Sequence, residues 1–84
     1  SSGFRFDSRF LFDVSQLRLI LQGIDVERFK GIFRTNDGGT VLNLTRGVLT
    51  ELSVSYCEES RCEVIGRDLP DDLTDQLLIL EVIK

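Results

Sequence analysis

The chain has 84 residues, with ten Lys and Arg against fourteen Asp and Glu and a formal net charge of −4. Its composition, 42% hydrophobic and 29% charged, is typical of a folded domain, whole or part of a larger protein, and argues against disorder. The acidic balance disfavours a nucleic-acid partner, and no apolar run is long enough to predict a membrane span or a signal peptide.

The first element expected along the chain is a strand over residues 4–12. Four phenylalanines share one parity of this segment, interrupted by Ser8, and Arg5, Asp7 and Arg9 occupy the other. Such alternation is typical of a half-buried strand with its aromatic side chains facing the core. The inward-facing set comprises Phe4, Phe6, Phe10 and Phe12.

A short amphipathic helix is predicted to follow, beginning at Asp13. Asp13 is a suitable N-cap, and Gln16 lies three residues further on, as in an approximate capping box. Gly23 suits the left-handed position that ends many helices. One apolar stripe is expected to pack on a sheet, formed by Val14, Leu17, Leu21 and Ile24.

The middle of the chain predicts a series of strands joined by short turns. Alternation over 26–35 places Phe29 and Phe33 on one face, and Asn36-Asp37-Gly38-Gly39 is a strong turn signal. Return strands are expected over 40–45, over 48–56 and over 62–65. The strand over 48–56 places four apolar residues on one parity: Val48, Leu52, Val54 and Tyr56.

A last helix is predicted to begin near Pro70, followed by Asp71, Asp72 and Asp75, because Pro and acidic residues favour a helix N-terminus. Leu73, Leu77 and Leu80 would form its apolar face. The expected fold is a single α+β domain over residues 1–84 with the order β-α-β-β-β-β-α. Its sheet should be mostly antiparallel, with two helices packed on one face.

The sequence does not predict an enzyme. The chain has no His, the commonest general base, and no phosphate-binding loop motif. Gly38-Gly39 between two strands indicates a hairpin. Adjacent acidic residues diverge along the chain, so they do not form a catalytic pair. No catalytic residue and no cofactor is expected in this chain.

Cys57 and Cys62 form the alternative site, a small metal-binding module, with Glu58, Glu59 and Glu63 nearby. If the strands over 48–56 and 62–65 pair across the 58–61 turn, the two sulfurs would be cross-strand neighbours. A tetrahedral zinc site needs four ligands, so such a site would be weak and open. Two cysteines also favour a reducing, cytoplasmic location over a disulfide scaffold.

The best surface feature is a basic stripe of Arg28, Lys30 and Arg34, with Arg46 as a possible extension. One interpretation is a solvated strand face that pairs with acidic neighbours. The other is a docking face for an acidic surface on another domain. Phe29 and Phe33 face the opposite side, so they cannot act as stacking platforms for nucleic acid.

Three segments in order resemble one family. RFKGIFRT follows a short helix and contains the pattern R-x-K-G; FRFDSRFLFD precedes that helix; SRCEVIG lies near the end. Together with the segment from Asp71 to Leu78, they resemble the C-terminal domain of CobW-type GTPases, a metallochaperone class related to the nickel-insertion and urease-accessory GTPases.

This resemblance implies an accessory or regulatory domain separated from its N-terminal GTPase domain. GTP, magnesium and a zinc or cobalt ion would then belong to the parent protein, which would act in metal delivery or cofactor (cobalamin) biosynthesis. The implied partners are the GTPase domain itself, a metal-receiving client protein, or both. The shared motif makes Arg28, Lys30 and Gly31 the interaction candidates, with Arg34 beside them. Gly31 also indicates a close approach or a bulge in its strand.

Overall fold

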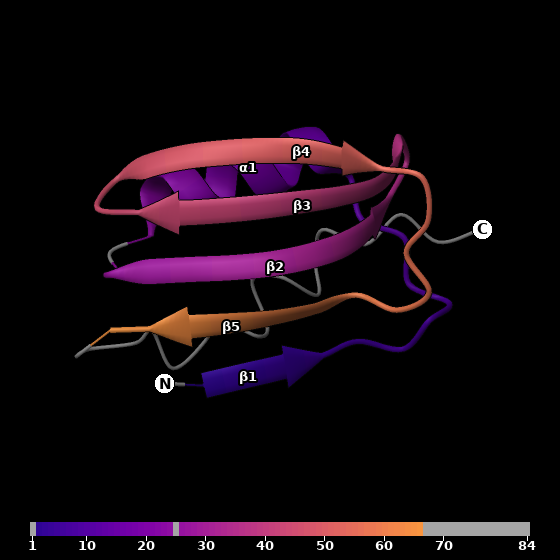
Figure 1. Ribbon diagram of the computed structural model, residues 1–84, viewed down its shortest axis with the longest axis horizontal. Coiled ribbons are helices and arrows are strands. Elements are labelled where there is room, and N and C mark those ends of the chain that lie inside the picture. Colours follow the sequence, from indigo (N-terminus) through magenta and orange to yellow (C-terminus); the bar gives the residue numbers. More distant parts are fainter. Residues whose placement is uncertain (1, 25, 67–84) are drawn as a thin grey trace.

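The computed structural model describes residues 2–24 and 26–66. In chain order its elements are β1 (Ser2–Arg5), α1 (Val14–Gly23), β2 (Arg28–Thr35), β3 (Gly38–Thr45), β4 (Val48–Val54) and β5 (Arg61–Ile65). The five strands form one antiparallel sheet with the order β1-β5-β2-β3-β4 (Figure 1). The last described strand therefore lies between the first two.

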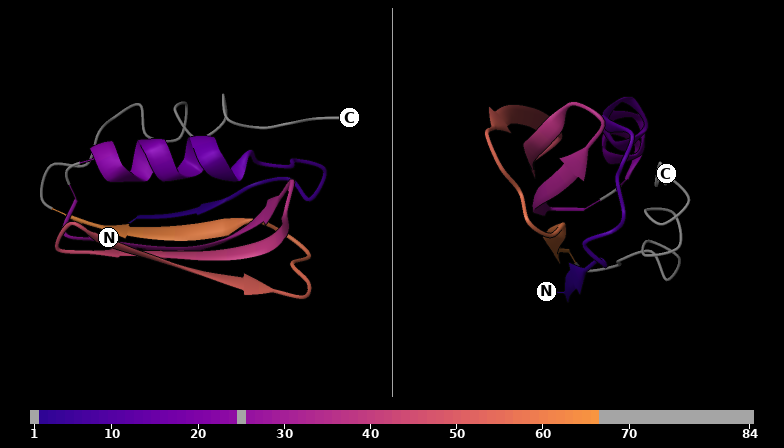
Figure 2. Two further views of the ribbon diagram at one scale, coloured as in Figure 1. Left: turned by 90° about the horizontal axis from the view of Figure 1, so that it is seen from above. Right: turned by 90° about the vertical axis from the view of Figure 1, so that its right-hand side faces the viewer.

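One face of the sheet, here called the helix face, packs against α1. The opposite face, here called the open face, carries no helix among the described residues. The connection between β4 and β5 lies over one end of it, where Cys57 approaches Gly39 (Figure 2). The expectation of two helices on one face is corrected, because the described residues contain a single helix on a five-stranded sheet. The second helix expected near Pro70 lies outside the described residues.

The segment after β1 also differs from the prediction. The expected strand over 4–12 ends at Arg5, because the carboxylate of Asp7 accepts the backbone N–H of Arg9 at 2.9 Å and turns the chain. Phe12 then meets the ring of Phe33 edge-on, with ring centroids 5.2 Å apart. Phe6 contacts Phe12 in the same way. These aromatic rings fill part of the helix face.

The helix α1 forms where the sequence predicts it. The carboxylate of Asp13 accepts the N–H of Gln16 at 3.1 Å, and the buried stripe is Val14, Leu17 and Leu21. Gly23 does not take the predicted left-handed conformation. The chain leaves the helix through an extended residue, Ile24, with φ −85°.

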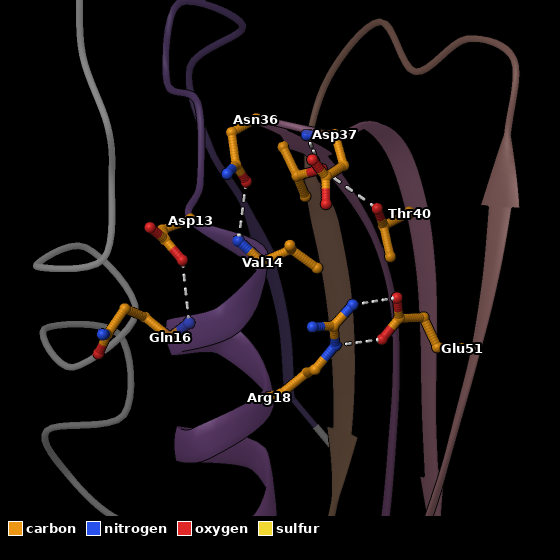
Figure 3. A network of polar contacts seen from close by, with 9 residues as sticks. Asp13, Val14, Gln16, Arg18, Asn36, Asp37, Thr40 and Glu51 are labelled. Atoms are coloured by element: carbon orange, nitrogen blue, oxygen red, sulfur yellow. Dashed lines mark hydrogen bonds and ion pairs between the residues drawn. The ribbon is translucent and has the colours of Figure 1, made fainter.

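Two polar contacts attach α1 to the sheet (Figure 3). The N–H of Val14 donates to the side-chain oxygen of Asn36, in the turn between β2 and β3, at 3.1 Å. Further along the helix, the guanidinium of Arg18 holds the carboxylate of Glu51 on β4. The helix is therefore fixed at its N-terminus and at its middle.

Both predicted hairpins are present. Asn36 and Asp37 connect β2 to β3, with Gly38 at φ +93°. Arg46 and Gly47 connect β3 to β4, and both have positive φ, 51° and 80°. Two consecutive residues of positive φ match the right-handed twist of the flanking strands.

Candidate interaction surface

The charged residues of β2 point away from α1, as the alternation predicts. Phe29 and Phe33 are fully buried on the helix face. Arg28 and Lys30 are exposed, and Arg34 is half-buried, on the open face. The connection between β4 and β5 packs at the Arg34 end of this face. The exposed side chains of Arg28 and Lys30 can meet a partner without any rearrangement of the sheet.

The strand order adds two cations that sequence reasoning did not assign to this surface. β5 lies beside β2, so Arg61 is opposite Ile32, and β1 lies beside β5, so Arg5 is opposite Arg61. The sequence carries a signal for Arg61, since it alternates with the buried Cys62 and Val64. We call the resulting set the basic surface; it comprises Arg5, Arg28, Lys30, Arg34 and Arg61.

The basic surface is hollowed at its centre. An open depression of about 640 Å³ lies between Arg5, Lys30 and Arg61. Its lining also includes the apolar Ile32 and Val41 and one acidic residue, Glu63. Charged groups thus surround an apolar patch. This combination suits a partner segment that carries both carboxylates and aliphatic side chains.

A second depression, of about 710 Å³, contains Arg28 and Arg46. The N–H of Arg46 donates to the carbonyl of Glu27, which precedes β2, at 3.3 Å. Arg46 therefore extends the basic stripe at one end, as the sequence suggests, although it lies in a turn and not on a strand face.

Few of these charges are neutralised among residues 2–24 and 26–66. Within those ranges Arg5 forms an ion pair with Glu59 at 3.9 Å, and the other four members of the basic surface form none. Glu63 is opposite Lys30 in the register of β5 and β2, yet the two side chains form no ion pair there. Counted over the described residues, the open face carries more cations than anions, in a chain whose net charge is −4.

Gly31 has a packing role on the helix face. A Cβ atom there would lie 2.6 Å from Cε2 of Phe33 and 2.8 Å from Cβ of Cys62. The predicted close approach is confirmed, and the alternative bulge is wrong, because β2 pairs without interruption with both neighbours. Any contact of Gly31 with a partner is limited to its backbone, which lines the central depression.

The cysteines are not cross-strand neighbours, because β4 pairs with β3 whereas β5 lies between β1 and β2. Both are free and buried. Burial raises the pKa of the Cys62 thiol to about 12. Burial also raises the pKa of Cys57, whose thiol donates to the carbonyl of Glu59 at 3.3 Å. Metal ligation requires thiolates, so this environment works against the alternative site. No group of three potential metal-ligating side chains lies together in the described part of the chain.

No family model, curated protein or solved structure matches this chain. The resemblance to the C-terminal domain of CobW-type GTPases therefore stays a prediction. Among the described residues, no helix has the length and apolar character needed to cross a bilayer.

Proposed function

We propose that this chain is a non-catalytic interaction domain that binds an acidic protein surface through its basic surface. One observation carries the proposal. The open face gathers three cations, Arg5, Lys30 and Arg61, and a single anion, Glu63, around a largely apolar depression, although the chain as a whole is acidic. Complementary charge steers such a partner and fixes its orientation, and the apolar centre adds burial once the partner has docked.

The family resemblance supplies the partner in this proposal. The chain would be the accessory domain of a cytoplasmic CobW-like GTPase that delivers zinc or cobalt or supports cofactor biosynthesis. The acidic surface would belong to its own GTPase domain or to the client that receives the metal. GTP, magnesium and the delivered ion would be bound outside this chain.

The test compares two single charge reversals at exposed cations. Lys30→Glu changes the centre of the basic surface, whereas Arg9→Glu changes a cation in the turn after β1. We expect Lys30→Glu to weaken binding to the GTPase domain at least tenfold by titration calorimetry, and Arg9→Glu to leave it unchanged. Binding by the wild type should also weaken as salt is added.

Two outcomes would contradict different parts of this proposal. Equal binding by wild type and Lys30→Glu would exclude docking through the basic surface. A gene with no nucleotide-binding domain beside this segment would exclude the GTPase as the partner, and the basic surface would then need another acidic protein.

A further inference from the structure

The strand β4 forms one edge of the sheet that residues 2–24 and 26–66 build (Figure 1). Its seven residues pair with β3 in an uninterrupted register and include no Pro, no Lys and no bulge. In an antiparallel edge strand, every second residue directs its backbone N–H and C=O away from the sheet. Natural proteins usually block such an edge with charges, prolines or bulges, because it pairs readily with another strand.

Exposed apolar side chains are concentrated at this same edge. Val48 and Leu52 are each 64% exposed on the open face of β4, and Tyr56, two residues beyond the strand, is 74% exposed. In the described residues just one other large hydrophobic side chain is comparably exposed, Leu19 on α1, at 62%. A cluster of this kind marks an interaction site more often than scattered surface residues do.

The charges along this edge also favour pairing with β4 of a second copy of the chain. Glu51 is the only charged side chain of β4, and Arg18 of α1 already holds its carboxylate (Figure 3). When two copies of β4 pair, neither strand would therefore place an unpaired charge against the other. Arg46 precedes β4 and Glu58 follows it, and both are exposed. Antiparallel pairing would bring the beginning of one strand beside the end of the other, so these opposite charges would approach each other twice.

We propose that β4 pairs antiparallel with β4 of a second copy of this chain, which joins two five-stranded sheets into one continuous sheet. A two-fold axis makes the interface isologous, so the contacts are self-complementary. The register that gathers the apolar side chains places Leu52 opposite Leu52 of the second copy. Val48 then lies opposite Tyr56, and Thr50 lies opposite Val54, all on the open face.

This dimer goes beyond the proposed docking function and uses other residues, so each can fail alone. The first test measures the mass of the full 84-residue chain by sedimentation velocity from the low micromolar to the millimolar range. The wild type should pass from monomer to dimer. Leu52→Lys should stay monomeric across this range, and Leu19→Lys, an equally exposed residue on α1, should dimerise as the wild type does.

The second test examines the register by oxidative cross-linking. Leu52→Cys should form an intermolecular disulfide because the two copies of this residue face each other across the axis. Thr50→Cys, on the same face of the same strand, should not, because it lies opposite Val54. The native cysteines are buried and should contribute little background.

A wild type that remains monomeric at the highest concentration would overturn the proposal. A dimer that Leu52→Lys leaves intact would also overturn it, because the contact would then lie elsewhere. A dimer lost in Leu52→Lys, but cross-linked through Thr50→Cys rather than Leu52→Cys, would contradict the register. Unchanged circular dichroism of each variant would exclude misfolding as the cause.

Discussion

Arg18 of α1 and Glu51 of β4 join the helix to the edge strand through two short contacts. Nε of Arg18 lies 2.6 Å from Oε1 of Glu51, and Nη2 lies 2.7 Å from Oε2. Such two-point pairs are more directional than a single surface ion pair. The hydrogen bonds from Arg18 lower the pKa of Glu51 below its ordinary value of 4.5.

The first prediction concerns the pH dependence of this pair. A carboxyl whose folded-state pKa is lowered stabilises the fold above the unfolded-state pKa, and loses that effect as the pH falls through the folded-state pKa. Glu51→Gln should therefore be less stable than the wild type near neutral pH, and the difference should shrink in acid below 4.5. Urea unfolding at stepped pH measures it. In an Arg18→Gln background the same substitution should have little effect.

The second prediction concerns close packing at Gly31. Gly31→Ala should lower the free energy of unfolding by about 1–3 kcal/mol, because the new methyl group overlaps Phe33 and Cys62. Gly23→Ala is the matched control. A methyl group added at Gly23, at the end of α1, would have no atom within 4 Å. The variant should therefore be neutral or more stable by about 0.5–1 kcal/mol. Equal destabilisation by both variants would contradict the packing role.

The third prediction concerns the turn between β3 and β4. Arg46 has φ 51°, a left-handed conformation that costs most L-residues about 1–2 kcal/mol and that Asn tolerates better. Arg46→Asn should therefore raise the melting temperature measured by circular dichroism. Arg46→Lys keeps the charge and the unfavourable conformation, so it should melt close to the wild type. The reverse order would show that charge, not backbone strain, governs this turn.

The fourth prediction concerns the reactivity of the thiols. The raised pKa values of Cys62 and Cys57 keep both thiols protonated, so a thiol reagent should label the native protein far more slowly than the unfolded protein. Cys62, with its pKa near 12, should react more slowly than Cys57. Labelling of Cys57→Ser and Cys62→Ser variants at mildly alkaline pH distinguishes them. Rapid labelling of native Cys62 would contradict its burial.

Local signals in the sequence predicted much of the secondary structure. The Asp13 cap, the stripe Val14, Leu17 and Leu21, and the turn at Asn36 each depend on residues close together in the chain. The same is true of the opposed faces of β2. These features were predictable because short-range hydrogen bonding and side-chain periodicity determine them.

Long-range features were not predictable in the same way. Alternation of phenylalanines over 4–12 cannot distinguish a strand from an extended connection that leaves the sheet after Arg5. The basic surface gains Arg5 and Arg61 only because β5 lies between β1 and β2. The apolar parity of β4 gave no sign that it would lie on the open face, since that depends on which side α1 covers.

The position of β5 has a consequence for the order in which the chain can fold. During synthesis β2, β3 and β4 emerge in succession and can pair through short turns. β1 is made before them, yet its partner in the sheet, such as Cys62 opposite Phe4, is made only at the end of the described chain. β1 must therefore remain unpaired, with Phe4 exposed, until β5 leaves the ribosome.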